Sequence, residues 1–262
     1  MQQPGGAEAP EHRRAIGNTP SPRRRRSGIV REAASVVVAV LVLTWLLQTF
    51  VGRQYIVPSE SMESTLHGCA GCTNDRIVID KLSYTLGEAP RPGEVVVFKA
   101  PTQSWDENWT SPRSRNTFAR GAQDVLSWFG FAPPDENDLV KRVVATAGQT
   151  VECHRATGTG VTVDGTPLHE PYIDAELQRE DASTEQPGTP DPCHGADFGP
   201  ITVPARSLWV MGDNRAHSAD SRYHIEDQLQ GTVPVSAVRG KVVAIIWPVS
   251  RWSTVATPNP QH

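Results

Sequence analysis

Residues 33–52 read AASVVVAVLVLTWLLQTFVG, a run of 20 residues without a charged side chain. A helix of that length is about 30 Å long, which matches the hydrocarbon thickness of a bilayer. Residues 36–43 are apolar on every face, unlike the single apolar stripe of a helix that packs on a core. A cleavable signal peptide is the closer alternative, but residues 48–53 lack its small-x-small cleavage pattern. The stretch therefore predicts a retained transmembrane helix.

The segment before this span is basic and rich in proline. Residues 1–28 hold six arginines, two glutamates and four prolines, with almost no large apolar side chains. Because such a composition cannot bury a core, residues 1–32 are predicted to be disordered. An arginine excess beside a span marks the cytoplasmic side, and the net charge of −4 argues against general nucleic-acid binding. We expect a cytoplasmic N-terminus and an extracytoplasmic domain over residues 53–262.

Beyond the span, the pattern is one of strands. Short β-branched runs bounded by Gly, Pro or Asp are typical of strands. Six such runs are visible, at residues 76–80, 94–98, 139–145, 160–163, 208–211 and 240–247. They predict a mostly β, antiparallel domain. Two long insertions, at about residues 100–138 and 171–200, interrupt it, and loops of that length are commonly functional or mobile.

All four cysteines lie on the predicted outer side, where thiols are commonly oxidised. Three pairings are open, and nearness in sequence favours Cys69–Cys72 together with Cys153–Cys193. The Cys69-x-x-Cys72 pattern also resembles a redox or zinc motif. Zinc normally needs a second ligand pair at matching spacing, and a redox pair normally follows a strand in a βαβ unit. We therefore expect two structural disulfides and no metal.

Two serines, Ser59 and Ser61, follow the span closely. A serine hydroxyl needs a base before it can act as a nucleophile, and the eight histidines show no pattern of a triad. Among the four lysines, Lys141 stands within an apolar run, where desolvation would lower its pKa. The run by itself leaves two interpretations open. Lys141 is a buried base or, as the alternation of side chains along a strand favours, it faces solvent.

After the two serines and the run around Lys141, a third group of candidate residues follows the strand predicted at residues 208–211. It consists mostly of polar residues. Residues 212–222 read GDNRAHSADSR, in which Asp220 and Arg222 can pair. So many short polar side chains indicate a tightly hydrogen-bonded loop, with a solvated turn as the plain alternative.

Taken together, the clusters resemble the bacterial type I signal peptidases, also called leader peptidases. The likeness covers about residues 33–249 and rests on four stretches in the family's order: PSESMESTL at 58–66, GEVVVF at 93–98, KRVVATAGQ at 141–149 and GDNRAHSADSR at 212–222. It implies a mostly β, membrane-bound serine endopeptidase that removes signal peptides from exported preproteins after small residues. It also implies a monomer in the bacterial cell membrane that needs no cofactor.

By the same resemblance, Ser61 is the nucleophile and Lys141 the general base. The Ser59 hydroxyl and the backbone N–H of Ser61 would form the oxyanion hole, and Ser218 would orient the Lys141 amine. Four further residues would shape the site through salt bridges: Arg142, Asp213, Asp220 and Arg222. The extended substrate would add to an exposed strand edge.

Some positions depart from the family pattern. Glu60 stands where glycine is usual between the two serines, and Ala216-His217 replaces a common Asp-Asn pair. A carboxylate beside the oxyanion hole would oppose the developing negative charge unless its side chain points away. We expect Glu60 to affect the rate of the reaction rather than its type.

Two other functions compete with the peptidase. A self-cleaving Ser/Lys protein of the repressor type would share the dyad, but the long anchor and the missing DNA-binding half argue against it. An anchored thiol redox or binding module would depend on Cys69 and Cys72. That module would lose its function when both cysteines are replaced by serine, whereas a peptidase would tolerate the change.

Overall fold

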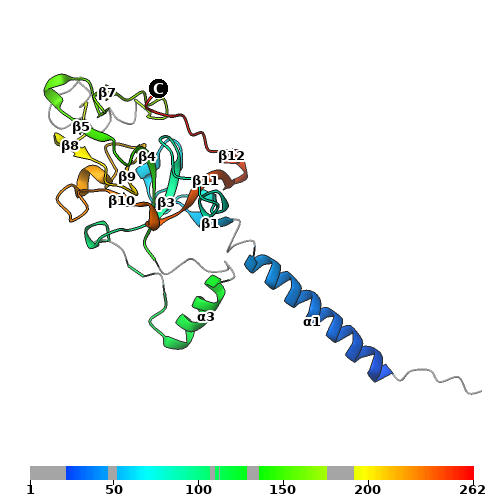
Figure 1. The fold of residues 1–262 in the computed structure, drawn as a ribbon. Helices are drawn as coiled ribbons and strands as arrows, with labels where there is room; N and C mark the ends of the chain where they lie inside the picture. The colour runs from blue at the N-terminus through cyan, green and yellow to red at the C-terminus, as the bar shows by residue number, and fades with distance from the viewer. Residues whose placement is uncertain (1–21, 47–51, 107–109, 112, 129–135, 176–191) are drawn as a thin grey trace, which may run out of the picture. The chain divides into compact units, whose positions relative to one another are not determined.

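The computed structural model describes residues 22–46, 52–106, 110–111, 113–128, 136–175 and 192–262 (Figure 1). The chain divides into two compact units, residues 1–43 and residues 44–262. The first contains most of helix α1 (Pro22–Leu46), and the second contains all the strands.

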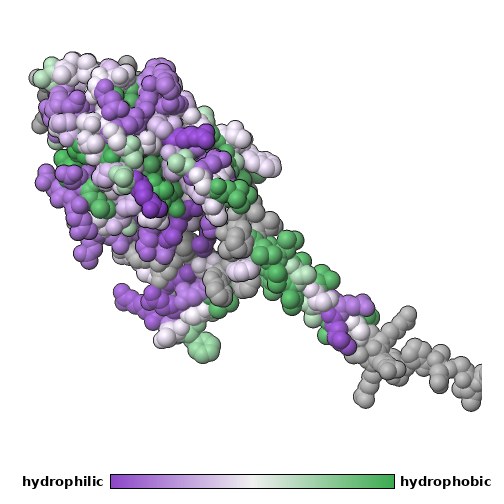
Figure 2. All heavy atoms as spheres, in the orientation of Figure 1, coloured by the Kyte–Doolittle hydropathy of each residue, from purple (hydrophilic) through white to green (hydrophobic). Residues whose placement is uncertain are grey.

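Helix α1 has an apolar part, Gly28–Leu46, that is long and apolar enough to cross a membrane. Its valine side chains are exposed, with Val36 at 61% and Val38 at 58%, and Figure 2 shows this apolar surface along the helix. The predicted span covered residues 33–52, whereas the helix begins at Pro22 and Gly52 belongs to strand β1. Arginine favours helix, and proline is tolerated in the first turn, so the helix extends into the segment predicted to be disordered. The predicted disorder of residues 1–21 lies outside the described residues.

The larger sheet has eight antiparallel strands. Seven follow the order β1-β2-β11-β3-β4-β9-β10, and β12 pairs with β11. Their bounds are β1 Gly52–Ile56, β2 Arg76–Asp80, β3 Val95–Lys99, β4 Asp138–Thr146, β9 Ser207–Met211, β10 Val233–Pro234, β11 Val238–Trp247 and β12 Ser253–Thr254.

A smaller antiparallel sheet has the order β7-β6-β5-β8. Its strands are β5 Thr150–Cys153, β6 Thr162–Val163, β7 Thr166–Pro167 and β8 Phe198–Thr202. The two sheets confirm the predicted mostly β, antiparallel architecture, and each of the six predicted runs contains a strand. The prediction missed β1, β5, β7, β8, β10 and β12, most of which are short or contain Gly or Pro.

Short helices connect the strands. The α-helices are α2 Leu82–Thr85 and α3 Thr117–Trp128, so the first predicted insertion contains a helix of 12 residues. The 3-10 turns are η2 Glu60–Met62, η3 Gln103–Trp105, η4 Arg155–Thr157, η6 Ser221–His224, η7 Val235–Ala237 and η8 Val249–Arg251.

Strand β4 lies in the interior of the larger sheet and is buried on both faces. Val140 packs in one core cluster, Val143 in a second, and Val144 and Ala145 in a third. Alternation along a strand sends neighbouring side chains to opposite faces, but here both faces are covered. Lys141 is consequently only 4% exposed, and the solvent-facing interpretation is wrong.

Candidate active site

Ser61 and Lys141 meet although 80 positions separate them in the sequence. Ser61 lies in the short turn η2, and Lys141 lies in the middle of β4. The Lys141 Nζ donates a hydrogen bond of 2.6 Å to Ser61 Oγ. Ser61 is 8% exposed, so the hydroxyl and the amine meet where little water reaches them.

The burial of Lys141 changes its protonation. Desolvation is the largest influence and lowers the pKa of Lys141 from 10.5 to about 8. The carboxylates of Asp220 and Asp213 act in the opposite direction, and the Arg222 guanidinium adds to the lowering. An amine with this pKa is neutral in a substantial fraction of molecules near neutral pH, which a proton acceptor requires.

The segment around Ser61 is held by apolar residues before, within and after η2. Val57, Met62 and Leu66 are almost completely buried in one core cluster, at 2%, 1% and 0% exposure. Ser59 is exposed and donates from its Oγ to Ser61 Oγ over 3.3 Å. The two hydroxyls therefore lie next to each other, on a segment that is anchored to the core by its apolar side chains.

Next to Lys141 on β4, Arg142 forms a buried pair with Asp213. Its Nε and Nη2 donate to the two carboxylate oxygens over 2.9 and 2.7 Å, and the side chains are 1% and 0% exposed. The guanidinium also lies 4.0 Å from the centre of the Tyr172 ring. Thr65 donates to the same carboxylate over 2.5 Å. This network ties β4 and the loop after β9 to the segment that follows Ser61.

Asp220 and Arg222 form a second bidentate pair, with distances of 2.9 and 2.8 Å. The backbone N–H of Gly212 donates to the same carboxylate over 3.0 Å. Burial by itself would raise the pKa of Asp220, but the Arg222 guanidinium and these hydrogen bonds hold the pKa below its ordinary value. Asp220 therefore remains ionised, and its charge acts on the pKa of Lys141.

Ser218 is buried beside Ser61. A Cβ on Gly212 would lie 2.2 Å from Ser218 Oγ and 2.4 Å from the Ser61 carbonyl oxygen, so these three residues pack directly together. Ser218 is 2% exposed, and among the described residues its Oγ has no hydrogen-bond partner. Ser218 Oγ therefore makes no hydrogen bond to the Lys141 amine in this structure, and its orienting role stays a prediction.

One buried pair near the site was missed by the sequence interpretation. Arg215 is 2% exposed and donates to both carboxylate oxygens of Glu170, one of them over 2.9 Å. Burial raises the pKa of Glu170, but the Arg215 charge outweighs it and the pKa is lowered. Arg215 stood inside the quoted motif, whereas nothing in the sequence marked Glu170 as its partner.

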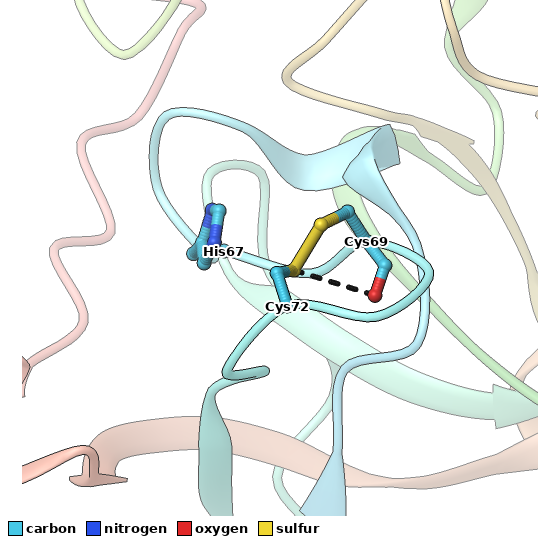
Figure 3. A group of neighbouring side chains, drawn as sticks. All are labelled: His67, Cys69 and Cys72. Atoms are coloured by element: carbon cyan, nitrogen blue, oxygen red, sulfur yellow. Dashed lines mark hydrogen bonds between the residues drawn. A yellow bond between two sulfur atoms is a disulfide. The ribbon is translucent and has the colours of Figure 1, made fainter.

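Figure 3 shows the loop that carries the first cysteine pair. The structure joins Cys69 to Cys72, and Cys153 to Cys193, which is the pairing preferred from the sequence. The donor atoms of His67, Cys69 and Cys72 lie within 4.8 Å of one another. However, the two sulfurs are bonded to each other, and a zinc ligand must be a thiolate.

This disulfide loop lies directly against the segment that leads to Ser61. A Cβ on Gly68 would lie 2.4 Å from the carbonyl oxygen of Val57 and 2.8 Å from that of Ser59. The loop therefore supports the backbone that leads to Ser61.

Known proteins resemble this chain over most of its length. Residues 30–247 match the family described as "Signal peptidase, peptidase S26". A "Signal peptidase I" of Mycobacterium tuberculosis is 51% identical over 249 residues, covering 93% of this chain and 81% of the relative. A "Probable signal peptidase I" of Mycobacterium leprae is 49% identical over 251 residues, covering 91% and 83%. The crystal structure of a signal peptidase I from Enterococcus faecalis V583 matches with a TM-score of 0.34 at 20% identity, covering 59% of this chain and 97% of that one.

Proposed function

This chain belongs to the signal peptidase family S26, and from that membership and the site geometry we propose how its residues cleave a signal peptide. The chain is a serine peptidase that acts on preproteins bearing signal peptides. Ser61 is the nucleophile and Lys141 the general base. The observation that carries this assignment is the 2.6 Å contact between Ser61 Oγ and the buried Lys141 amine, whose pKa lies near 8.

In the first half of the reaction, neutral Lys141 accepts the Ser61 proton as Oγ attacks the scissile carbonyl carbon. Negative charge then develops on the carbonyl oxygen, where the Ser59 hydroxyl and the Ser61 backbone N–H donate hydrogen bonds. Collapse breaks the amide bond and leaves an ester on Ser61, while the Lys141 ammonium returns the proton to the leaving amine. In the second half, water attacks the ester with Lys141 again as the base.

An open strand edge beside the dyad can receive the substrate. Strand β3 pairs with β4 from Asp138 to Arg142, whereas β9 pairs with β4 only from Arg142 to Thr146. Residues 138–141 thus have no strand partner on the β9 side among the described residues. A signal peptide in extended conformation would add here as a further strand, which places its scissile bond near Ser61. Selection for small side chains before that bond is part of this proposal.

The apolar helix fits association with a membrane. We propose a monomer anchored once in the bacterial cell membrane, with the apolar helix Gly28–Leu46 crossing the bilayer and the catalytic domain on the outer side. The arginines before the span support this orientation, because such residues are retained on the cytoplasmic side.

The experiment uses the full chain in detergent with a preprotein substrate. Cleavage after a small residue, read by sequencing the new N-terminus, is expected for the wild type and not for Ser61→Ala. Lys141→Arg should also be inactive, because a guanidinium does not release its proton at working pH. Lys99→Arg is the matched control, since Lys99 is a half-exposed lysine outside the site.

Two outcomes would refute the assignment. Processing by Ser61→Ala at the wild-type position would exclude Ser61 as the nucleophile. Cleavage by Lys141→Arg at the wild-type rate would exclude Lys141 as the general base, because a guanidinium does not accept the Ser61 proton at working pH.

A further inference from the structure

Two residues that depart from the family pattern contact each other at the edge of the site. Glu60 Oε1 lies 3.0 Å from His217 Nδ1. Both side chains reach solvent, with 54% of Glu60 and 44% of His217 exposed. Glu60 stands between the two serines proposed to hold and attack the scissile carbonyl. Its carboxylate is therefore directed toward the loop after β9.

The position of His217 relative to the nucleophile is fixed through its own loop. The backbone N–H of Asn214 donates to the Ser61 carbonyl oxygen over 3.2 Å, and the side-chain oxygen of Asn214 accepts from the His217 backbone N–H over 3.4 Å. Asn214 thus binds both Ser61 and His217. Moving His217 away from the turn that carries Glu60 would break these hydrogen bonds.

A carboxylate at this position needs to be restrained. The neighbouring Ser59 hydroxyl and Ser61 N–H donate to the oxygen that becomes negative in the transition state. A free Glu60 side chain on an exposed turn would sample orientations toward those donors, where it competes for them and repels the developing charge. The contact between His217 Nδ1 and Glu60 Oε1 favours the orientation toward the loop after β9 over those orientations.

We propose that His217 is a positioning residue that holds the Glu60 carboxylate away from the scissile carbonyl oxygen. The proposal rests on the assignment of Ser61 as the nucleophile. It explains how this chain accommodates a carboxylate between the two serines.

The test is a double-mutant cycle on the full chain in detergent, with a peptide substrate that has a small residue before the scissile bond. His217→Ala should lower kcat by about threefold to fivefold with little change in KM, since the effect is a screened charge acting on the transition state. Adding Glu60→Gln to His217→Ala should restore kcat, because the freed side chain then has no charge. His217→Asn should lose less than His217→Ala, since the amide can still donate to Glu60.

The control is Lys99→Ala, which breaks a comparably exposed ion pair with Glu136 and should not alter kcat. A merely structural pair predicts equal losses in Glu60→Gln and His217→Ala with no recovery in the double variant, and that result would overturn the proposal. So would an unchanged kcat in His217→Ala, or a change confined to KM. Cleavage by Ser61→Ala in the same assay would instead overturn the proposed function, independently of the His217 result.

Discussion

Replacing Lys141 by methionine should abolish cleavage and at the same time stabilise the protein near neutral pH. Methionine keeps most of the length of the side chain and fits a site that is 4% exposed. It has no charge to bury and no lone pair that can accept the Ser61 proton. Activity and stability are therefore expected to change in opposite directions.

The magnitude follows from the pKa of the lysine. Burial lowers that pKa from 10.5 to about 8. At 1.36 kcal/mol for each unit, burying the ammonium costs about 3 kcal/mol of folding free energy. Because the folded pKa lies below the unfolded one, this cost is fully present below pH 8. It disappears as the pH rises through 8 toward 10.5, where the unfolded chain also loses the proton.

We expect Lys141→Met to exceed the wild type in free energy of unfolding by up to about 3 kcal/mol at pH 7, and by much less at pH 10. Urea unfolding of the full chain in detergent, followed by tryptophan fluorescence at both pH values, measures this. Lys99→Met is the control for loss of an exposed lysine and should change stability by about 0.5 kcal/mol or less.

Either of two results would refute the reasoning. A Lys141→Met protein that is no more stable than the wild type at pH 7 would show that the ammonium is not buried at a net cost. A stability difference that stays constant between pH 7 and pH 10 would show that proton release by Lys141 is not its origin.

Further predictions concern the packing around the site. Gly212→Ala should lower kcat about 100-fold, because the added Cβ would lie 2.2 Å from Ser218 Oγ and 2.4 Å from the Ser61 carbonyl oxygen and must displace one of them. Peptide cleavage measures it, and an unchanged kcat would mean that the nucleophile segment adapts without cost. Replacing Cys153 and Cys193 by alanine should lower the free energy of unfolding by about 4 kcal/mol, as expected for a cross-link that spans 40 positions. Equal urea midpoints for this variant and the wild type would contradict that expectation.

Local pattern was enough to predict the apolar helix and six of the twelve strands in the described residues. Twenty uncharged residues specify a helix that can cross a membrane, and β-branched runs between turn residues specify strands such as Arg76–Asp80. Both signals depend only on residues that are neighbours in the sequence, so they can be interpreted without knowledge of the fold. The boundaries were less reliable, because helix α1 propagates into the arginine run from Pro22.

The motifs identified the candidate residues, but the sequence did not predict the environment of these residues in the fold. The alternation around Lys141 favoured a side chain in solvent, and only the three core clusters that cover both faces of β4 reverse this. The Glu170–Arg215 pair had no local signal at all, since its members are 45 positions apart.

The sequence alone determined that a helix apolar enough to cross a membrane precedes a β domain with a serine and a lysine in family order, because composition and spacing carry that information. The tertiary structure decided that Lys141 is buried, with its Nζ 2.6 Å from Ser61 Oγ, and that Glu60 faces His217. Desolvation and contact depend on which distant segments cover a side chain. That arrangement arises only when the sheets pack.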